Sequence, residues 1–314
     1  MPERAESNLF MDTLIDALRE HVRVLTVDIG ERSVDRPDNL ARTAEYIRSF
    51  HEAAGLRTTL EPYRYRDTTV ANVIAETGLP SKRAGRYLLG AHYDCVRGTV
   101  GADDNASSVA VLLETARLLS AAEVGRTARP VVKLVAFALE EHPAFWSPYR
   151  GSWVHAKRAR SSGERIDGML CLEMVGYRSR RPGSQKYPFP LMHMNYPRVG
   201  DFIGVIGDTR SAPLVRSVCA AFARNPRLPA QHLVVPFRGW LTHFVRRSDH
   251  VSFWDSGYRA VMLTDTAEFR NPNYHGKSDT LETLDFEFMA ELVRSLFHFF
   301  SGPEPLTVTG EEGS

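Results

Sequence analysis

The sequence predicts an α/β fold, a three-layer sandwich with a mixed, mostly parallel central sheet and helices on both faces. Seven apolar, strand-like runs occur between residues 72 and 266, and helical or turn-rich segments separate them. Strands that alternate with helical segments are typical of a buried, largely parallel sheet. With 314 residues, 43% of them hydrophobic, the chain is long enough for one large domain. We therefore expect a single domain over residues 1–314, with residues 303–314 as a frayed polar tail.

Periodicity along the chain places the individual elements. Apolar residues recur at near-helical spacing over residues 8–24 and 38–55, where Asp38 is a plausible helix cap and Gly55 a stop. The expected strands follow at residues 72–77, 86–94, 131–139, 167–177, 201–208, 232–237 and 258–266. A loop without periodicity, residues 178–200, contains four prolines. Loops of this length in compact domains tend to be functional, so this loop could contact a substrate.

Composition restricts the classes of partner and the compartment. Lys and Arg number 39 against 38 Asp and Glu, so no net field attracts nucleic acid or an anionic membrane. The chain has no apolar run of membrane-spanning length, and we expect no Sec-type signal. Its three cysteines, Cys95, Cys171 and Cys219, lack C-x-x-C spacing, which argues against a disulfide framework and against a thiolate zinc site. We expect a cytoplasmic protein with a small or peptide-like partner.

The stretch GAHYDCVRGTVGADDN, residues 90–105, holds one histidine and three aspartates directly after an apolar run. Buried charges are costly unless they pair or bind a metal. The stretch could be a polar loop in which Asp and Asn side chains cap the following helix. Alternatively, it could belong to a metal site, and the rest of the sequence must decide between these two interpretations.

Residues of types that commonly bind metals recur near the ends of several expected strands and in the loop before the C-terminal helix. In chain order they are His92, Asp94, Asp103, Asp104, Glu140, Glu141, Glu173 and His275. Ligands of open α/β sheets bind beyond the carboxyl ends of the strands, so polar residues there matter more than polar residues elsewhere. This distribution favours the metal site over the polar loop.

The residue types indicate which metal chemistry to expect. Two imidazoles with several carboxylates and no thiolate are ligands of a zinc, cobalt or manganese centre that acts as a Lewis acid. More ligands are present than one catalytic zinc takes, whereas two ions bridged by a carboxylate and a water would use them all. We therefore expect two Zn²⁺ ions per chain, with cobalt or manganese as alternatives. In the tandem Glu140–Glu141, one glutamate would bind metal and the other would stay free as a base.

These residues lie in motifs that resemble those of the co-catalytic zinc aminopeptidases, a metallopeptidase family that also contains glutamate carboxypeptidases and glutaminyl cyclases. The motifs, in order over residues 38–302, are GAHYD, GADDNASSVAVLLE, FALEEHPAF, GSWVHA, LEMVGY, SDHVSF and NPNYHGKSDTLETLD. The resemblance implies that His92, Asp104 and Glu173 bind one metal. Asp104 would bridge to the second metal, which Glu141 and His275 would also bind.

The resemblance assigns further roles and has three departures. It makes Glu140 the general base and Asp94 the residue that orients His92, since a ligating imidazole usually donates its other N–H to a carboxylate. Asp249 falls at the acid of the SDH motif. The departures are Glu173, where many of these aminopeptidases have Asp, Cys95, which replaces a small residue, and Ser108, which replaces a common glycine.

The resemblance implies a metal-dependent hydrolase of peptide or amide bonds, most simply an aminopeptidase that removes N-terminal residues from a peptide or aminoacyl substrate. A water between the metals would attack the carbonyl, and Glu140 would take its proton and pass it to the leaving amine. One alternative is a glutaminyl cyclase, which also carries HYD, a Glu-Glu pair and a segment similar to FWSP. Another is a non-catalytic, metal-bearing binding module, against which the presence of Glu140 argues.

Overall fold

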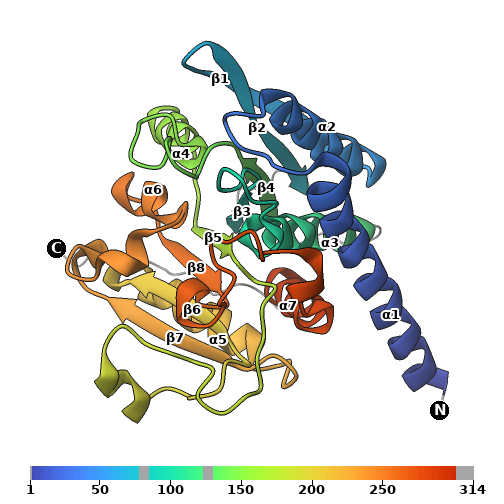
Figure 1. Ribbon diagram of the computed structural model, residues 1–314, viewed down its shortest axis with the longest axis vertical. Helices are drawn as coiled ribbons and strands as arrows, with labels where there is room; N and C mark the ends of the chain where they lie inside the picture. Colours follow the sequence, from blue (N-terminus) through green and yellow to red (C-terminus); the bar gives the residue numbers. More distant parts are fainter. Residues whose placement is uncertain (1, 78–84, 123–129, 302–314) are drawn as a thin grey trace.

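A computed structural model describes residues 2–77, 85–122 and 130–301 of the chain. Eight strands form one sheet in the order β1-β2-β4-β3-β5-β8-β6-β7 (Figure 1). Their bounds are β1 Arg57–Tyr65, β2 Thr68–Thr77, β3 Arg86–His92, β4 Val131–Phe137, β5 Gly168–Glu173, β6 Ile203–Asp208, β7 Ala230–Val235 and β8 Ala260–Thr264. β4, β3, β5 and β8 are parallel to one another. β2 is antiparallel to β4, β1 is antiparallel to β2, and the parallel pair β6–β7 is antiparallel to β8. The mixed, mostly parallel sheet is therefore confirmed.

Helices cover both faces of this sheet, as expected (Figure 1). One face carries α1 Pro2–Arg23, α2 Pro37–Ala53, α3 Ser108–Ala121, α5 Ala212–Phe222 and α7 Phe286–Ser301, and the other carries α4 Gly151–Ser161 and α6 His250–Asp255. Successive side chains of a strand point to opposite faces. In β5, Leu170 and Leu172 therefore join the larger core under α3, whereas Met169 and Cys171 join the smaller core under α4 and α6.

The N-terminal elements differ from the expectation in two details. Asp38 is not the cap of α2, because the helix already begins at Pro37, whose fixed φ suits the first helical position. Asp38 lies instead in the first turn, where its charge interacts favourably with the helix dipole. The strand β1 was not expected, since its sequence is largely polar and contains Pro62. Both features are tolerated because β1 is an edge strand that pairs only with β2 in the described part of the chain.

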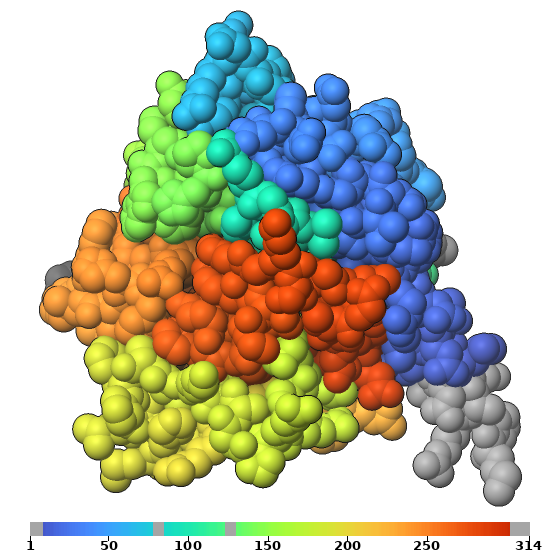
Figure 2. Space-filling model, viewed as in Figure 1, coloured from blue at the N-terminus to red at the C-terminus, as the bar shows by residue number. Residues whose placement is uncertain are grey.

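The carboxyl ends of β3, β4, β5 and β8 meet at one edge of the sheet, because these strands are parallel. In Figure 2 the C-terminal part of the chain, in red, lies between the N-terminal helices, in blue, and the loop 178–200, in yellow-green. Arg178 at the start of that loop donates a hydrogen bond to Asp285 at 2.6 Å. No helix within the described ranges is both long and apolar enough to cross a membrane. The expected tail, residues 303–314, lies outside the described residues.

Candidate metal centre

Three buried side chains from separate segments converge at the carboxyl edge of the sheet. His92 is the last residue of β3, Asp104 lies in the helical turn Ala102–Ser107 that precedes α3, and Glu141 follows β4. One donor atom from each of them lies within 4.8 Å of the others. They are 0%, 4% and 6% exposed, respectively, so their charges are largely removed from water. Such a cluster is costly unless a cation balances it.

The two remaining expected ligands, Glu173 and His275, adjoin this cluster. Glu173 Oε2 lies 3.4 Å from His92 Nε2, which is also 3.5 Å from Asp104 Oδ1. On the other side, His275 Nε2 lies 3.1 Å from Asp104 Oδ2 and 3.9 Å from Glu141 Oε1. Asp104 therefore presents one carboxylate oxygen to each histidine. The structure brings all five expected ligands together, with Asp104 at the centre.

Two of the donor atoms support the fit to a metal ion. His92 Nε2 and Asp104 Oδ1 are buried and have no hydrogen-bond partner among residues 2–77, 85–122 and 130–301. Buried polar atoms in folded proteins are almost always paired, so unpaired atoms need an explanation. Neutral imidazole nitrogens and carboxylate oxygens are the donors that zinc takes in catalytic sites. The residues present therefore fit a divalent cation of this kind.

The pKa values describe the same crowding of charge. Burial raises the pKa of Glu141 well above its ordinary value, and the neighbouring carboxylates of Asp104 and Glu140 raise it further. Burial also raises the pKa of Glu140 well above its ordinary value, although His92 opposes this. For His92, burial lowers the pKa, but Glu173 and Asp94 outweigh it and leave the pKa well above its ordinary value. A cation among these groups would stabilise the ionised carboxylates.

Asp94 supports both sides of the centre. Its Oδ1 lies 3.3 Å from His92 Nδ1, on the side of the ring away from the other ligands. Its two carboxylate oxygens also accept the backbone N–H groups of Glu140 and Glu141, at 2.9 and 3.0 Å. The sequence pointed to the contact with His92 but not to the second contact, which fixes the turn that carries the two glutamates.

The turn that carries Asp104 is held by residues that sequence reasoning missed. Asp279 accepts the backbone N–H groups of Asp103 and Asp104, at 2.8 and 3.1 Å. The Asp103 carboxylate accepts hydrogen bonds from the Gly176 backbone N–H and from Asn271 Nδ2, at 2.8 and 2.6 Å. The place of Asp279 in the same Asn- and Gly-rich loop as His275 was the available signal for it. Asp103 thus positions the turn and does not point into the cluster of donors.

Glu173 is also oriented by a residue that was not expected. Ser248 Oγ donates a hydrogen bond to Glu173 Oε2 at 2.6 Å and lies 3.1 Å from Cys171 Sγ. Ser248 precedes Asp249 in the SDH motif, so the serine of this motif contacts a candidate ligand. Asp249 is fully buried, and burial raises its pKa. Cys95, the other unusual residue near the centre, accepts a hydrogen bond from the Arg32 backbone N–H and has a structural role.

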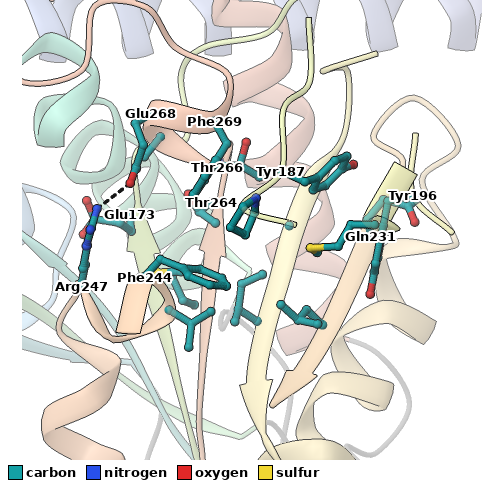
Figure 3. Close-up of a pocket in the computed structure, with 18 of the residues that line it drawn as sticks. Glu173, Tyr187, Tyr196, Gln231, Phe244, Arg247, Thr264, Thr266, Glu268 and Phe269 are labelled. Atoms are coloured by element: carbon teal, nitrogen blue, oxygen red, sulfur yellow. Dashed lines mark hydrogen bonds and ion pairs between the residues drawn. The ribbon is translucent and has the colours of Figure 1, made fainter. Parts of the chain in front are cut away.

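An apolar pocket begins at Glu173 and extends over β8, β6 and β7 (Figure 3). Its volume is about 820 Å³, including the solvent-filled space at its opening. Its floor is the sheet, and its walls include Phe244, Phe269 and Tyr274, which precedes His275. The loop 178–200 supplies Tyr187 and Tyr196, whose rings lie 5.7 Å apart. The loop that was expected to be functional therefore forms one wall of a cavity adjoining the candidate metal centre.

Comparison with known proteins agrees with this geometry. The model of peptidase family M28 matches residues 72–299, which is more than half of the chain. The chain belongs to peptidase family M28. It is 40% identical over 287 residues to the Escherichia coli (strain K12) protein YfbL, covering 88% of this chain and 85% of that protein. It is also 26% identical over 252 residues to a probable zinc metalloprotease of Pyrenophora teres f. teres. This match covers 71% of this chain but only 49%, about half, of the metalloprotease.

Solved structures share the fold of this chain at low sequence identity. The Legionella pneumophila LapA aminopeptidase superposes with a TM-score of 0.69 at 18% identity, covering 94% of this chain and 74% of that one. The zinc aminopeptidase BSAP of Bacillus subtilis gives 0.68 at 13% identity, with coverage of 91% and 93%. The Porphyromonas gingivalis glutaminyl cyclase gives 0.64 at 17% identity, with coverage of 93% and 97%. The family resemblance and the α/β fold are thus confirmed.

Proposed function

We propose that this M28 chain is a zinc-dependent aminopeptidase that removes N-terminal residues from peptides. The observation that carries the proposal is Glu140, whose Oε1 is buried without a hydrogen-bond partner among the described residues. It sits beside a five-residue donor set and is not needed to complete that set. A carboxylate so placed is suited to accept a proton from an attacking water. The names of several relatives, which include zinc metalloproteases and probable leucine aminopeptidases, support the same activity.

The proposed roles of the residues follow from their positions. His92, Asp104 and Glu173 would hold one zinc ion, and Asp104, Glu141 and His275 would surround a second. Zinc bound there would supply a Lewis acid that polarises the scissile carbonyl and lowers the pKa of a water molecule to near neutrality. Glu140 would accept the proton of that water and return it to the leaving amine. Asp94 would keep His92 and the two glutamates in place.

The cavity favours action at the N-terminus of a peptide. Glu173 and Tyr274, the neighbour of His275, both line the pocket, so the pocket adjoins the donor set. The side chain of the first residue would fill the pocket, and the carbonyl of that residue would then lie by the donor set.

We further propose that residues 1–314 form one catalytic domain, which the single eight-stranded sheet supports. The cytoplasmic location stays a prediction, supported by the absence of disulfides among Cys95, Cys171 and Cys219.

A second candidate function is a glutaminyl cyclase, because the Porphyromonas gingivalis cyclase shares the fold over 93% of this chain. A cyclase must bring the substrate's own amine onto its side-chain amide and exclude water from the carbonyl. The five donors grouped here around Asp104 favour a site with two ions and water between them, which suits hydrolysis. We therefore rank the cyclase second.

An activity assay separates these functions. The protein is incubated with alanyl, leucyl and phenylalanyl p-nitroanilides and with a glutaminyl peptide, and free amino acid and ammonia are followed separately. We expect free amino acid from at least one anilide, no ammonia from the peptide, loss of activity with a chelator and recovery with zinc. Ammonia with a pyroglutamyl product, and no anilide hydrolysis, would establish the cyclase instead. Turnover of neither substrate by zinc-loaded protein would contradict both enzymes.

A further inference from the structure

The floor of the pocket is one row of residues that crosses four neighbouring strands. Glu173 of β5 pairs with Thr264 of β8, Thr264 pairs with Gly204 of β6, and Gly204 pairs with Gln231 of β7. All four line the pocket, and Figure 3 shows Thr264 between Glu173 and Gln231. Neighbouring strands lie about 4.8 Å apart. Gly204 is therefore about 10 Å from the metal-side end of the row and Gln231 about 14 Å from it.

Gly204 is the one position in this row without a side chain. The backbone does not require a glycine there, because the φ of Gly204 is not in the left-handed region. A Cβ at Gly204 would lie 3.3 Å from the Thr264 carbonyl oxygen and 3.5 Å from Ile206 Cδ1, so a small side chain would fit with a slight adjustment. The glycine therefore leaves space in the pocket, because a larger side chain at this position would fill the passage, that is, the space between Thr264 and Gln231.

The chemistry of the walls indicates what the pocket accepts. Met262, Ile206 and Leu233 form the next row of the floor, paired across β8, β6 and β7, and aromatic rings cover it. The charged residues Arg247 and Glu268 lie at the wall but pair with each other at 2.5 Å. Their opposite charges offset each other, so together they add no net charge to the wall. Apart from Glu173 at the metal side, the described lining favours a large apolar side chain.

We propose that Gly204 determines the substrate specificity of this site, by leaving room for a large apolar, especially aromatic, side chain on the N-terminal residue. The inference rests on the proposed aminopeptidase function, because it places the first residue of the substrate in the pocket. An aromatic side chain whose α-carbon lies beside Glu173 would extend along the row toward Gly204. A branched side chain at position 204 would collide with the tip of this aromatic side chain. The side chain of an N-terminal alanine in the substrate is too short to reach position 204.

Steady-state kinetics of Gly204→Val tests the proposal. We expect the ratio of kcat/KM for phenylalanyl over alanyl p-nitroanilide to fall at least roughly tenfold, since a methylene-sized misfit in an apolar pocket changes selectivity roughly 10- to 200-fold. Val234→Trp is the matched control, because Val234 is 37% exposed on β7 and points away from Gln231 and Leu233. This variant should keep the wild-type ratio. An unchanged ratio in folded Gly204→Val would overturn the proposal.

A binding measurement separates this inference from the proposed function. 2-Phenylethylamine is titrated calorimetrically into wild type and Gly204→Val, and its affinity should fall at least about tenfold in the variant. If no anilide is hydrolysed but this difference is present, the pocket assignment stands and the aminopeptidase proposal fails. Hydrolysis of anilides with equal amine binding by both proteins would leave the enzyme and refute the role of Gly204.

A second variant protects the test against misfolding. If Gly204→Val does not fold, Gln231→Trp fills the same passage from the exposed edge strand β7, where substitutions disturb the core less. We expect it to lower the phenylalanyl over alanyl ratio in the same direction as Gly204→Val. A Gln231→Trp protein with the wild-type ratio and wild-type affinity for 2-phenylethylamine would show that the passage is not used.

Discussion

At the scale of single residues, Glu140 and Glu141 are neighbours in sequence with different surroundings. Glu141 Oε1 faces His275 Nε2 at 3.9 Å, within the donor set. Glu140 Oε1 has no hydrogen-bond partner among the described residues. The backbone before them turns through Leu139, which has a φ of +58°, and Asp94 holds both of their N–H groups. This tight turn directs the two adjacent carboxylates into different surroundings.

Replacing each glutamate by glutamine should separate metal binding from proton transfer. Glu140→Gln keeps the size of the side chain but removes the base, so kcat for anilide hydrolysis should fall about 10² to 10⁴-fold. The zinc content of this variant, measured by elemental analysis, should stay near that of wild type. Glu141→Gln should lose zinc as well as activity, because an amide is a poor substitute for a ligating carboxylate. Zinc loss in Glu140→Gln with retention in Glu141→Gln would mean that the two roles are reversed.

At the scale of elements, the loop from His92 to Asp104 depends on tight backbone packing. Gly101 has a φ of +52°, and a Cβ there would lie 2.1 Å from the Asp104 carbonyl oxygen and 2.5 Å from Cys95 Cβ. The buried guanidinium of Arg32 donates hydrogen bonds to the carbonyl oxygens of Tyr93 and Gly101, at 2.9 and 3.0 Å. The N-terminal segment thus holds the loop that carries Asp104, although it contributes no donor to the cluster.

Gly101→Ala should therefore displace Asp104. We expect lower zinc content and a free energy of unfolding reduced by about 1–3 kcal/mol, the usual cost of a strained backbone. Gly98→Ala is the matched control, since Gly98 lies in the same loop with a φ of +77° but has nothing within 4 Å of its Cβ position. It should lose some stability through φ alone and keep its zinc. Equal zinc loss in both variants, measured by elemental analysis alongside urea unfolding, would contradict the steric argument.

At the scale of the whole molecule, the helices on the larger face enclose ionisable groups remote from the candidate active site. His51 of α2 is fully buried, and neither ring nitrogen has a hydrogen-bond partner within the described ranges. Burial, with a smaller contribution from nearby His21, lowers the pKa of His51 to about 4. His21 itself lies 3.1 Å from Glu114 of α3 and 2.6 Å from the Tyr46 hydroxyl. The packing of α1, α2 and α3 therefore depends on a neutral His51.

This burial predicts a pH dependence of stability. The folded pKa of His51, about 4, lies below its ordinary value of 6.5. Between these values the unfolded chain binds a proton that the folded chain does not, so stability is lost as pH falls from 6.5 toward 4. The slope from this residue approaches about 1.4 kcal/mol per pH unit. We expect His51→Leu to have a shallower loss of unfolding free energy in urea titrations at pH 6.5, 5.5 and 4.5; parallel curves for the two proteins would contradict the assignment.

Local patterns in the sequence determined the alternation of strands and helices, the positions of seven strands, and the residue types at the strand ends. These features depend on apolar periodicity and on side-chain chemistry, which neighbours in the chain share. From them, together with the motifs, came the resemblance to the co-catalytic zinc aminopeptidases and the five candidate ligands, whose roles stay predictions. The edge strand β1 was not predicted, because its sequence is largely polar and it lies at the edge of the sheet.

Tertiary structure decided the features that arise only when distant segments meet. Asp279 reaches the turn of Asp104 across more than 170 residues of sequence, and Ser248 reaches Glu173 across 75. The row from Glu173 to Gln231 exists because β6 inserts between β8 and β7 in a fixed register. Hydrogen bonds and strand pairing between remote segments follow from how the chain packs as a whole. A local sequence pattern does not determine the register in which one strand pairs with another. The depth of the pocket at Gly204 is therefore a property of the folded sheet.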